Sequence, residues 1–488
     1  MNEIELTPYA PNLVESTRSI GYSFHTALAD IIDNSVSNLA KRVDVRYSSS
    51  ENPFVAIIDD GIGMSKNILE QAMRYGSQSA LQKREGHDLG RFGLGLKMAS
   101  LSQCRKLTVI SKFRGKISAA TWDLDYIYKT EKWSLIIYNE KEIVNLKFYN
   151  ELSQYESGTV VLWENLDRIA DNEFEFEKEF NEKIDFADKH LSLVFHRFLS
   201  NKLNKQSFDL FFNLRKVEPI DPYFLSNPGT QQLEPETVFV EKIPIDVTPY
   251  ISPYMSKLTQ KERELLTEYK DLEIKQGLYI YRNKRLIVWG KWFRLLSDTD
   301  LNRLAKIRID LPNNIDEIWT IDVKKSSAQI PATIREELKQ IVERTVGKSE
   351  RVFQYRGRKV SNDNLVHVWN KIQTRDKVSY QLNKEFPMYQ ALKNSLDDNQ
   401  LRLFNIIINL IEDNFPYSAV YYDLAKDKGY EEKSLEDETV YSMMFEFYLT
   451  SKSNNLNDEQ IIKILRSTDA FSKYNDVIER IEKELGEN

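Results

Sequence analysis

Three polar side chains near the start of the chain have the types and spacing needed to bind a metal ion and move a proton. Asp30, Asp33 and Asn34 lie in "ADIIDNSVSN", residues 29–38, a segment whose isoleucines predict a helix. Residues at i, i+3 and i+4 share one face of an α-helix, so the two carboxylates and the amide should cluster. Carboxylates accept protons, and amide oxygens ligate hard cations. The alternative is an amphipathic helix whose polar stripe is merely solvated.

A second candidate is "FVAIIDDGIGM", residues 54–64. Its apolar start predicts a buried strand, which ends at Asp59 and is followed by Gly61 and Gly63. Spaced glycines allow a tight turn where a ligand can approach the backbone. A carboxylate at that turn can accept a hydrogen bond from an exocyclic amine. An ordinary strand-to-helix turn would have a similar pattern.

A third candidate is the glycine-rich stretch "GRFGLGLKMAS", residues 90–100, and seven of the 17 glycines lie between Gly61 and Gly95. A glycine-rich loop that opens a helix presents backbone N–H groups and a positive dipole end to an anion. The spacing matches neither the P-loop nor the Rossmann pattern. The alternative is a flexible surface loop.

The elements that must position these residues belong to a chain of 488 residues, long enough for two or three domains. The net charge of −7 gives no global attraction to nucleic acid or acidic lipid, so any anion-binding surface must be local. Cys104 is the only cysteine, which excludes an intrachain disulfide and favours a reducing compartment. Without a signal-peptide pattern or a long apolar run, we expect a cytoplasmic protein without membrane contact.

Taken in order, the three segments resemble the GHKL ATPases, which include gyrase B, MutL, heat-shock chaperones, histidine kinases and MORC proteins. "DIIDNS" is similar to the N-box, "DDGIGM" to the adenine-contacting box and "GRFGLGLK" to the glycine box. "SGTVVLWEN", from Ser157, resembles the final box. The resemblance implies a Bergerat-type α/β sandwich with a mixed sheet over residues 1–200, with an ATP lid at about 65–95.

The resemblance also implies roles for the residues. Asn34 would coordinate the Mg²⁺ that bridges the ATP phosphates, and Asp30 would orient or deprotonate the attacking water. Many relatives have Glu in place of Asp30, so slow turnover is expected. Asp33 has no assigned role, and structural support, a lid contact or solvation are all open. The implied nucleotide-binding residues are Asn34, Asp59, Gly61, Gly63, Met64, Gly90, Arg91, Phe92, Gly93, Leu94, Gly95, Leu96, Lys97 and, beside Asp59, Thr159.

Residues 201–348 read as strands followed by a helix. "FDLFFNLRKVEPIDPYFL" and "GLYIYRNKRLIVWGKW" alternate like strands, and Pro331 lies near an expected helix start. This order resembles the ribosomal-S5-like α+β transducer domain of gyrase B, MutL and MORC proteins, and "YIYRNKRLI" looks MORC-like. In such proteins a lysine reaches the γ-phosphate, which implies a catalytic role for Lys325, with Lys324 as the alternative. A solvated lysine pair on a loop is the other interpretation.

Residues 349–488 are expected to form a mainly helical C-terminal region. "YQLNKEFPMYQALKNSL", "DDNQLRLFNIIINLIEDNF" and the acidic last forty-odd residues all read as helices. Before them, residues 339–359 hold seven basic residues against Glu343 and Glu350, interleaved with aromatics. Such a stretch suits contact with phosphates and bases, and it equally suits a solvated linker.

These features favour an α+β protein that acts as an ATP-gated clamp of the MORC type. The resemblance implies Mg-ATP binding, slow hydrolysis and nucleotide-driven homodimerisation. It further implies action on DNA, alone or with a nuclease, helicase or methyltransferase partner, and a link to restriction or phage defence. The alternative is a chaperone-like ATPase that remodels a protein client. A histidine kinase is disfavoured, because no phosphoacceptor-histidine helix precedes the N-box.

Overall fold

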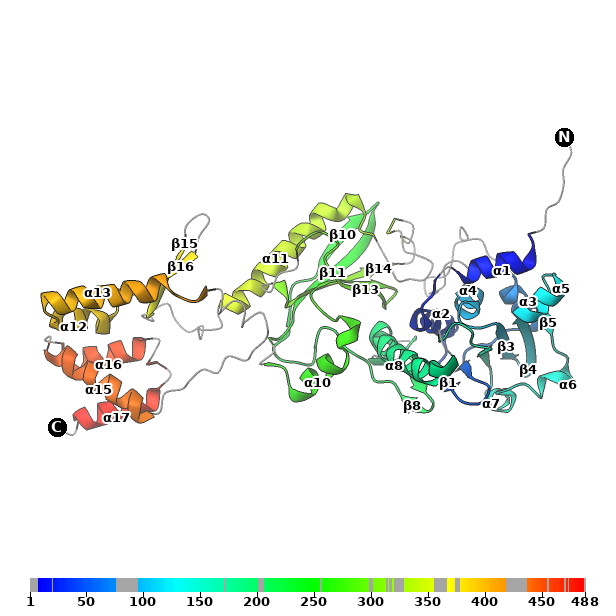
Figure 1. Cartoon of the computed structure of the whole chain (residues 1–488), viewed down its shortest axis with the longest axis horizontal. Helices are drawn as coiled ribbons and strands as arrows, with labels where there is room; N and C mark the ends of the chain where they lie inside the picture. Colours follow the sequence, from blue (N-terminus) through cyan, green and yellow to red (C-terminus); the bar gives the residue numbers. More distant parts are fainter. Residues whose placement is uncertain are drawn as a thin grey trace. The chain divides into compact units, whose positions relative to one another are not determined.

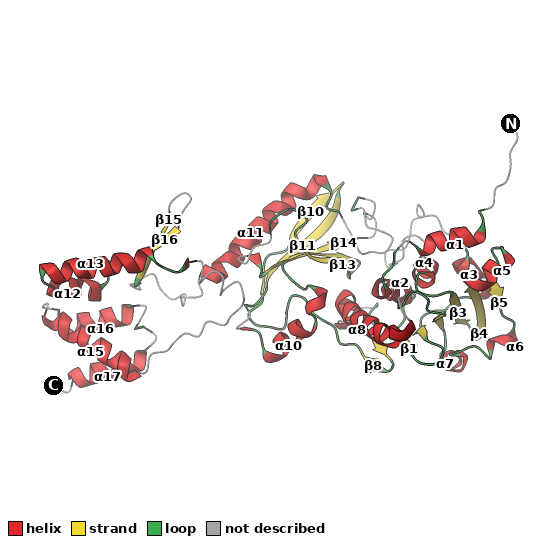
Figure 2. Cartoon of the chain, in the orientation of Figure 1, coloured by secondary structure: helices red, strands yellow, loops and turns green. Residues whose placement is uncertain are grey.

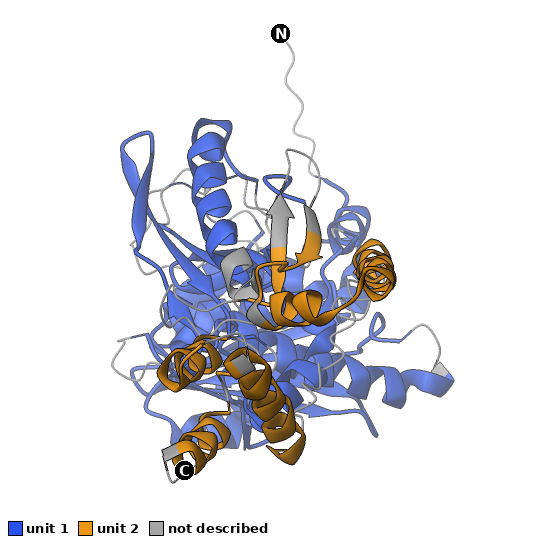
Figure 3. Ribbon diagram, turned by 90° about the vertical axis from the view of Figure 1, so that its left-hand side faces the viewer, with its two compact units in different colours: residues 1–354 blue, residues 355–488 orange. Residues whose placement is uncertain are grey.

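The chain divides into two compact units, residues 1–354 and residues 355–488 (Figure 3). The computed structural model describes residues 8–19, 21–75, 95–170, 173–200, 206–254, 257–297, 302–312, 315, 318–319, 329–354, 367–373, 378–417, 437–453, 456–468, 471–472 and 474–486.

The first unit begins with an eight-stranded mixed sheet in the order β5-β4-β3-β6-β2-β1-β7-β8 (Figure 1). The pair β1–β7 is parallel, and the other pairs are antiparallel. The strands are β1 (Arg42–Ser48), β2 (Phe54–Asp59), β3 (Lys106–Phe113), β4 (Lys116–Asp123), β5 (Ile136–Ile137), β6 (Gly158–Glu164), β7 (Asp209–Phe212) and β8 (Arg215–Lys216). The buried strand expected at residues 54–58 is confirmed as β2.

Helices cover both faces of this sheet, so the side chains of β2 are buried on both sides. Val55 and Ile57 belong to the main core, whereas Ala56 and Ile58 belong to a smaller core on the opposite face. The main core is covered by α1 (Ala10–Arg18), α2 (Phe24–Ser37), α3 (Lys66–Met73), α4 (Gly95–Leu101), α5 (Leu124–Thr130), α8 (Phe176–Val194) and α9 (His196–Ser200). The smaller core is covered by α6 (Glu140–Ile143) and α7 (Tyr149–Gln154).

A second sheet follows, in the order β10-β11-β14-β12-β13, with β9 paired to β11 (Figure 2). Its strands are β9 (Gln231–Gln232), β10 (Glu236–Val240), β11 (Ile243–Ile251), β12 (Gly277–Arg282), β13 (Arg285–Lys291) and β14 (Ala305–Leu311). Between β11 and β12 lies helix α10 (Gln260–Glu268). Asn283 and Lys284, at φ 47° and 71°, form the two-residue turn between β12 and β13, which suits the twist of a hairpin.

The two faces of the second sheet differ. Leu278 and Ile280 point into a core covered by helix α11 (Arg335–Gln354), whereas Tyr279 and Tyr281 join the main core of the first sheet. The helix expected after Pro331 is confirmed, since α11 follows a single 3₁₀ turn, Ala332–Ile334. The mixed α+β class is therefore confirmed, and the likeness to a ribosomal-S5-like transducer stays a prediction.

The first sheet extends beyond residue 200, where the sequence suggested a new domain. Strand β7 pairs in parallel with β1, and its Leu210 and Phe212 are buried in the main core. Alternation along residues 208–212 predicted a strand correctly, but a strand pattern does not specify its neighbour. The boundary between the compact units lies after residue 354.

The second unit combines a hairpin with helices. It contains β15 (Trp369–Gln373), β16 (Val378–Leu382), α12 (Pro387–Ser395), α13 (Asp398–Asp413), α15 (Asp437–Ser453), α16 (Asp458–Ser467) and α17 (Asn475–Gly486). The last three helices share one apolar core. The helix expected from Tyr380 onward is wrong at its start, because residues 380–382 complete β16 and the helix begins at Pro387. Proline fixes the φ angle of a first helical turn and therefore marks that start.

The single cysteine of the chain is buried. The thiol of Cys104 is fully buried and bonds the carbonyl of Ser100, and burial raises its pKa well above the usual range. Over the described ranges, no helix is both long and apolar enough to cross a bilayer.

Candidate functional site

The polar face predicted near the N-terminus lies on α2, and it is not a solvated stripe. Asp33 is fully buried, Asp30 is 4% exposed and Asn34 is half-buried. Oδ2 of Asp30 accepts a hydrogen bond of 2.8 Å from the hydroxyl of Tyr22, which is also buried. The interpretation as an ordinary solvated face is therefore wrong for the two aspartates.

Asp33 forms an ion pair with an arginine from the second sheet. Nε of Arg285, at the start of β13, donates to Oδ1 of Asp33 at 2.8 Å. Both side chains are almost completely buried, at 3% and 0% exposure. Of the alternatives open for Asp33, this geometry is structural support rather than solvation.

Asp59 closes strand β2 and lies directly opposite Thr159 of β6. Its carboxylate accepts hydrogen bonds from the Ser35 hydroxyl at 2.7 Å and from the Gly61 amide at 2.9 Å. Burial raises the pKa of Asp59 to about 6, although these two hydrogen bonds act in the opposite direction. The carboxylate is thus held by neutral donors and is almost completely buried from solvent.

The glycines after β2 are required by close backbone contacts. A Cβ at Gly61 would lie 2.9 Å from the Asn38 carbonyl oxygen and 3.0 Å from Oδ1 of Asp59. Gly63 has φ +70°, and a Cβ there would lie 1.9 Å from the Lys112 carbonyl oxygen. The tight turn predicted here is confirmed, and the space beside Asp59 depends on it.

A short polar network continues from Thr159. Its hydroxyl lies 3.0 Å from the hydroxyl of Ser111 on β3, which also accepts a hydrogen bond from the Met64 amide at 2.8 Å. The structure therefore brings together Asp59, Met64 and Thr159, as predicted from sequence. Tyr22, Ser35 and Ser111 were not predicted. Of these three residues, only Ser35 could have been suspected from the sequence, because it directly follows Asn34 on the predicted helix.

The glycine box is described only from its last glycine. Gly90, Arg91, Phe92, Gly93 and Leu94 lie outside the described residues, as do the lid residues 76–89 and the lysines 324 and 325.

Gly95, the last glycine of the box, begins helix α4 and lies close to Asp30. A Cβ at Gly95 would lie 3.5 Å from Oδ2 of Asp30. Leu96 packs against the main core, and Nζ of Lys97 donates to two carbonyls at the end of α3, Ala72 at 2.7 Å and Arg74 at 3.0 Å. Burial lowers the pKa of Lys97 to about 8.

One protein-family model matches the part of the chain that contains this site. Residues 22–159 match the family model described as "Histidine kinase-, DNA gyrase B-, and HSP90-like ATPase". The match supports the GHKL superfamily for this segment. A GHKL domain suggests ATP binding and ATPase activity, typically with Mg²⁺. No curated protein matches the chain. A solved structure described as "Crystal Structure of N terminal domain of a DNA repair protein" is 13% identical, with a TM-score of 0.41, covering 70% of this chain and 97% of that chain.

The residues of the GHKL segment fit a nucleotide with its cation. Among the described residues, no group of three or more His, Cys, Asp or Glu could hold a metal ion by itself. Magnesium is usually bound by one or two protein oxygens together with substrate phosphates and water. Half-buried Asn34, on the same face of α2 as Asp30, can supply such an oxygen.

Proposed function

We propose that the chain is an ATP-dependent conformational clamp of the MORC type that binds Mg-ATP and hydrolyses it slowly. The observation that carries the proposal is the buried Asp59 carboxylate, held by Ser35 and Gly61 in register with Thr159. The carboxylate would accept the exocyclic amine of adenine. At the other end of the site, Asn34 would hold Mg²⁺ together with the phosphates.

Asp30 would orient or deprotonate the attacking water. Its hydrogen bond from Tyr22 orients the carboxylate, and the start of α4 lies close to it. Aspartate is one methylene shorter than the glutamate of many relatives, so the water would be less well positioned and turnover slow. Lys325, or Lys324 in its place, would reach the γ-phosphate from the transducer-like part, residues 201–348.

Nucleotide-driven homodimerisation is part of the proposal. The lid and the transducer lysine would close together around a γ-phosphate, and residues 1–19 are available for exchange between protomers. Light scattering with a non-hydrolysable ATP analogue tests this, and the mass should double at saturating nucleotide. An unchanged monomer mass, or a dimer indifferent to nucleotide, would reject it.

We further propose that the clamp acts in the cytoplasm on DNA, with a nuclease, helicase or methyltransferase partner, as in restriction or phage defence. The basic segment 339–359 would contact phosphates. Replacing Arg351, Arg356, Arg358 and Lys359 by Ala should flatten the salt dependence of DNA binding, because fewer counterions are released. Absence of wild-type binding at low salt would favour the alternative, a chaperone-like ATPase for a protein client, with which the net charge of −7 is compatible.

A further inference from the structure

We infer that Arg285 is a positioning residue for ATP turnover, which acts through its ion pair with Asp33 on helix α2. In this way the second sheet would set the position of Asp30 and Asn34. The inference rests on the proposed ATP site, and it assigns a role to a residue from the hairpin "YIYRNKRLI" that lies far from the nucleotide boxes in sequence.

The guanidinium of Arg285 is held on the side of the second sheet. Arg285 directly follows the two-residue turn of the β12–β13 hairpin, so its backbone is fixed at the end of a ladder. Its Nη1 donates to the Leu286 carbonyl at 2.9 Å, and its Cζ lies 5.3 Å from the ring centroid of Phe195, the residue that ends α8. Arg285 is therefore held between β13 and the C-cap residue of α8, a helix that itself packs against α2.

The partner of Arg285, Asp33, lies on α2, the helix that carries the proposed catalytic Asp30 and the proposed magnesium ligand Asn34. It is adjacent to Asn34 and lies three residues after Asp30, so the three side chains move together with one turn of α2. The Nε–Oδ1 distance of 2.8 Å and the burial of both groups make this a direct, desolvated contact between sheet and helix. Catalysis is sensitive to such placement, since a displacement of about 1 Å can cost about 10²-fold in rate.

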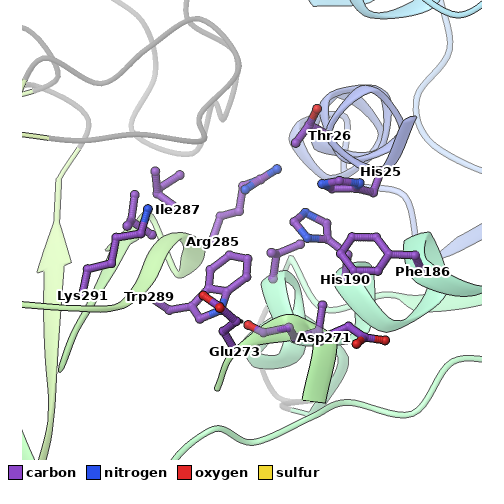
Figure 4. A pocket seen from close by; sticks show the side chains of 13 residues that line it. His25, Thr26, Phe186, His190, Asp271, Glu273, Arg285, Ile287, Trp289 and Lys291 are labelled. Carbon is purple, nitrogen blue, oxygen red and sulfur yellow. The ribbon is translucent and has the colours of Figure 1, made fainter. Parts of the chain in front are cut away.

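Beside the ion pair, α2, α8 and β13 line a pocket that is open to solvent. A cavity of about 270 Å³ separates the first turn of α2, with His25 and Thr26, from Trp289 and Lys291 of β13 (Figure 4). Arg285 also lines this cavity. The ring of His190 on α8 lies 4.5 Å from that of His25 and 5.7 Å from that of Trp289, measured between centroids. Around this pocket α2, α8 and β13 are thus in contact, and the ion pair is a direct polar link between β13 and α2.

The chain offers a control in a second, more exposed ion pair, which links α9 to the second sheet. Arg197 of α9 bonds Asp310 of β14, and both side chains are 24% exposed. This pair joins the same two parts of the first unit, but neither residue lies on α2. Arg197→Met therefore loosens the junction without touching the catalytic helix.

The experiment compares full-length Arg285→Met, Asp33→Asn, the double variant and Arg197→Met. Each is measured for melting temperature, for affinity toward a non-hydrolysable ATP analogue and for single-turnover hydrolysis. The double variant leaves no buried charge without its partner, so it should regain much of the melting temperature lost by either single variant. Its hydrolysis should nevertheless stay at least about tenfold below wild type, because α2 is no longer held by the sheet.

Two controls separate positioning from stability. Arg197→Met should melt lower yet hydrolyse ATP within about twofold of wild type, and Arg285→Lys should recover part of the rate because it keeps the charge. The inference is overturned if the double variant hydrolyses ATP at the wild-type rate, or if Arg197→Met loses as much rate as Arg285→Met. A wild-type chain that binds no nucleotide would instead overturn the proposed function, and the inference with it.

Discussion

Two regions of this site hold a buried carboxylate in opposite ways. Asp33, on the helix side, faces the guanidinium of Arg285, whereas Asp59, at the end of β2, is held by a serine hydroxyl and a backbone amide. Neutral donors compensate a buried charge less than a cation does, and accordingly burial raises the pKa of Asp59 to about 6.

The difference indicates which carboxylate is part of the structure and which is available to a ligand. Asp33 is fully buried against its cation, so a ligand could reach it only by separating α2 from the second sheet. Asp59 retains 7% exposure and would gain from a further donor such as an adenine amine. A buried acid paired with a cation is thus a poor predictor of a binding site, and one held by neutral groups a better one.

The largest effect on ATP turnover is expected at Asp30, which lies on the same helix as Asp33. Asp30→Asn keeps the size and polarity of the side chain but removes its capacity to take a proton. ATP should still bind, and turnover should fall by about two to four decades, as is typical when a general base is lost. Phosphate release and calorimetry on the same variant measure both quantities. Hydrolysis at the wild-type rate would show that Asp30 is not the base.

The second prediction contrasts the stability roles of the two carboxylates. Arg285→Met removes the cation that Asp33 faces at 2.8 Å and should lower the free energy of unfolding by about 3–5 kcal/mol. Asp59→Asn should not lower it, because the neutral amide can still bond Ser35 and Gly61 and removes the charge whose burial raises the pKa of Asp59. Denaturant titration of the full chain measures both. Equal losses would remove the distinction between a structural and a ligand-binding carboxylate.

A third prediction concerns nucleotide affinity. Asp59→Ala should weaken ATP binding with or without magnesium, by about 10- to 100-fold, since a hydrogen bond to a charged group contributes about 1.5–3 kcal/mol. Asn34→Ala should weaken binding only when magnesium is present, because it removes an oxygen ligand of the cation. Normal Mg-ATP binding by both variants would place the nucleotide elsewhere.

The smallest effect is a pH dependence set by Asp59. Its folded pKa of about 6 lies above the ordinary value of 3.8, so the folded chain binds more protons between these values. The stability contributed by this group is therefore highest below about pH 4 and declines as the pH rises toward 6.

Ligand binding should show the opposite trend, because only the ionised carboxylate accepts the adenine amine fully. Affinity should rise by about tenfold from pH 5 to pH 7, as the ionised fraction grows. Asp59→Asn is the control, since the phosphates of ATP titrate in the same way with both proteins. Parallel affinity curves for the two proteins would exclude Asp59 from adenine binding.

The local part of the site could be predicted from the sequence. Helical spacing placed Asp30 and Asn34 on one face of α2, and the apolar run before Asp59 predicted a buried strand. The glycines at 61 and 63 predicted a close backbone approach, which the contacts confirm. The helix and the strand were predictable because periodicity acts within about ten residues, and the turn because of its glycines, although their close contacts are with distant Asn38 and Lys112.

The rest depends on contacts between distant segments. Arg285 is 252 residues from Asp33, and the sequence of its hairpin does not indicate that its partner lies on α2. The same holds for β7, whose alternation predicted a strand but not its place beside β1. Tyr22 escaped prediction for another reason, because an aromatic residue before a helix is ordinary and its hydroxyl partner becomes apparent only after folding.

The buried Cys104 makes this chain well suited to chemical labelling. Thiol reagents react with the exposed thiolate, and Cys104 offers neither exposure nor a low pKa. A cysteine introduced on the surface, for example in place of exposed Ser50, would thus carry a fluorophore alone, without first removing the native one. Distances between two such probes could then be followed as nucleotide is added, in the otherwise unaltered protein.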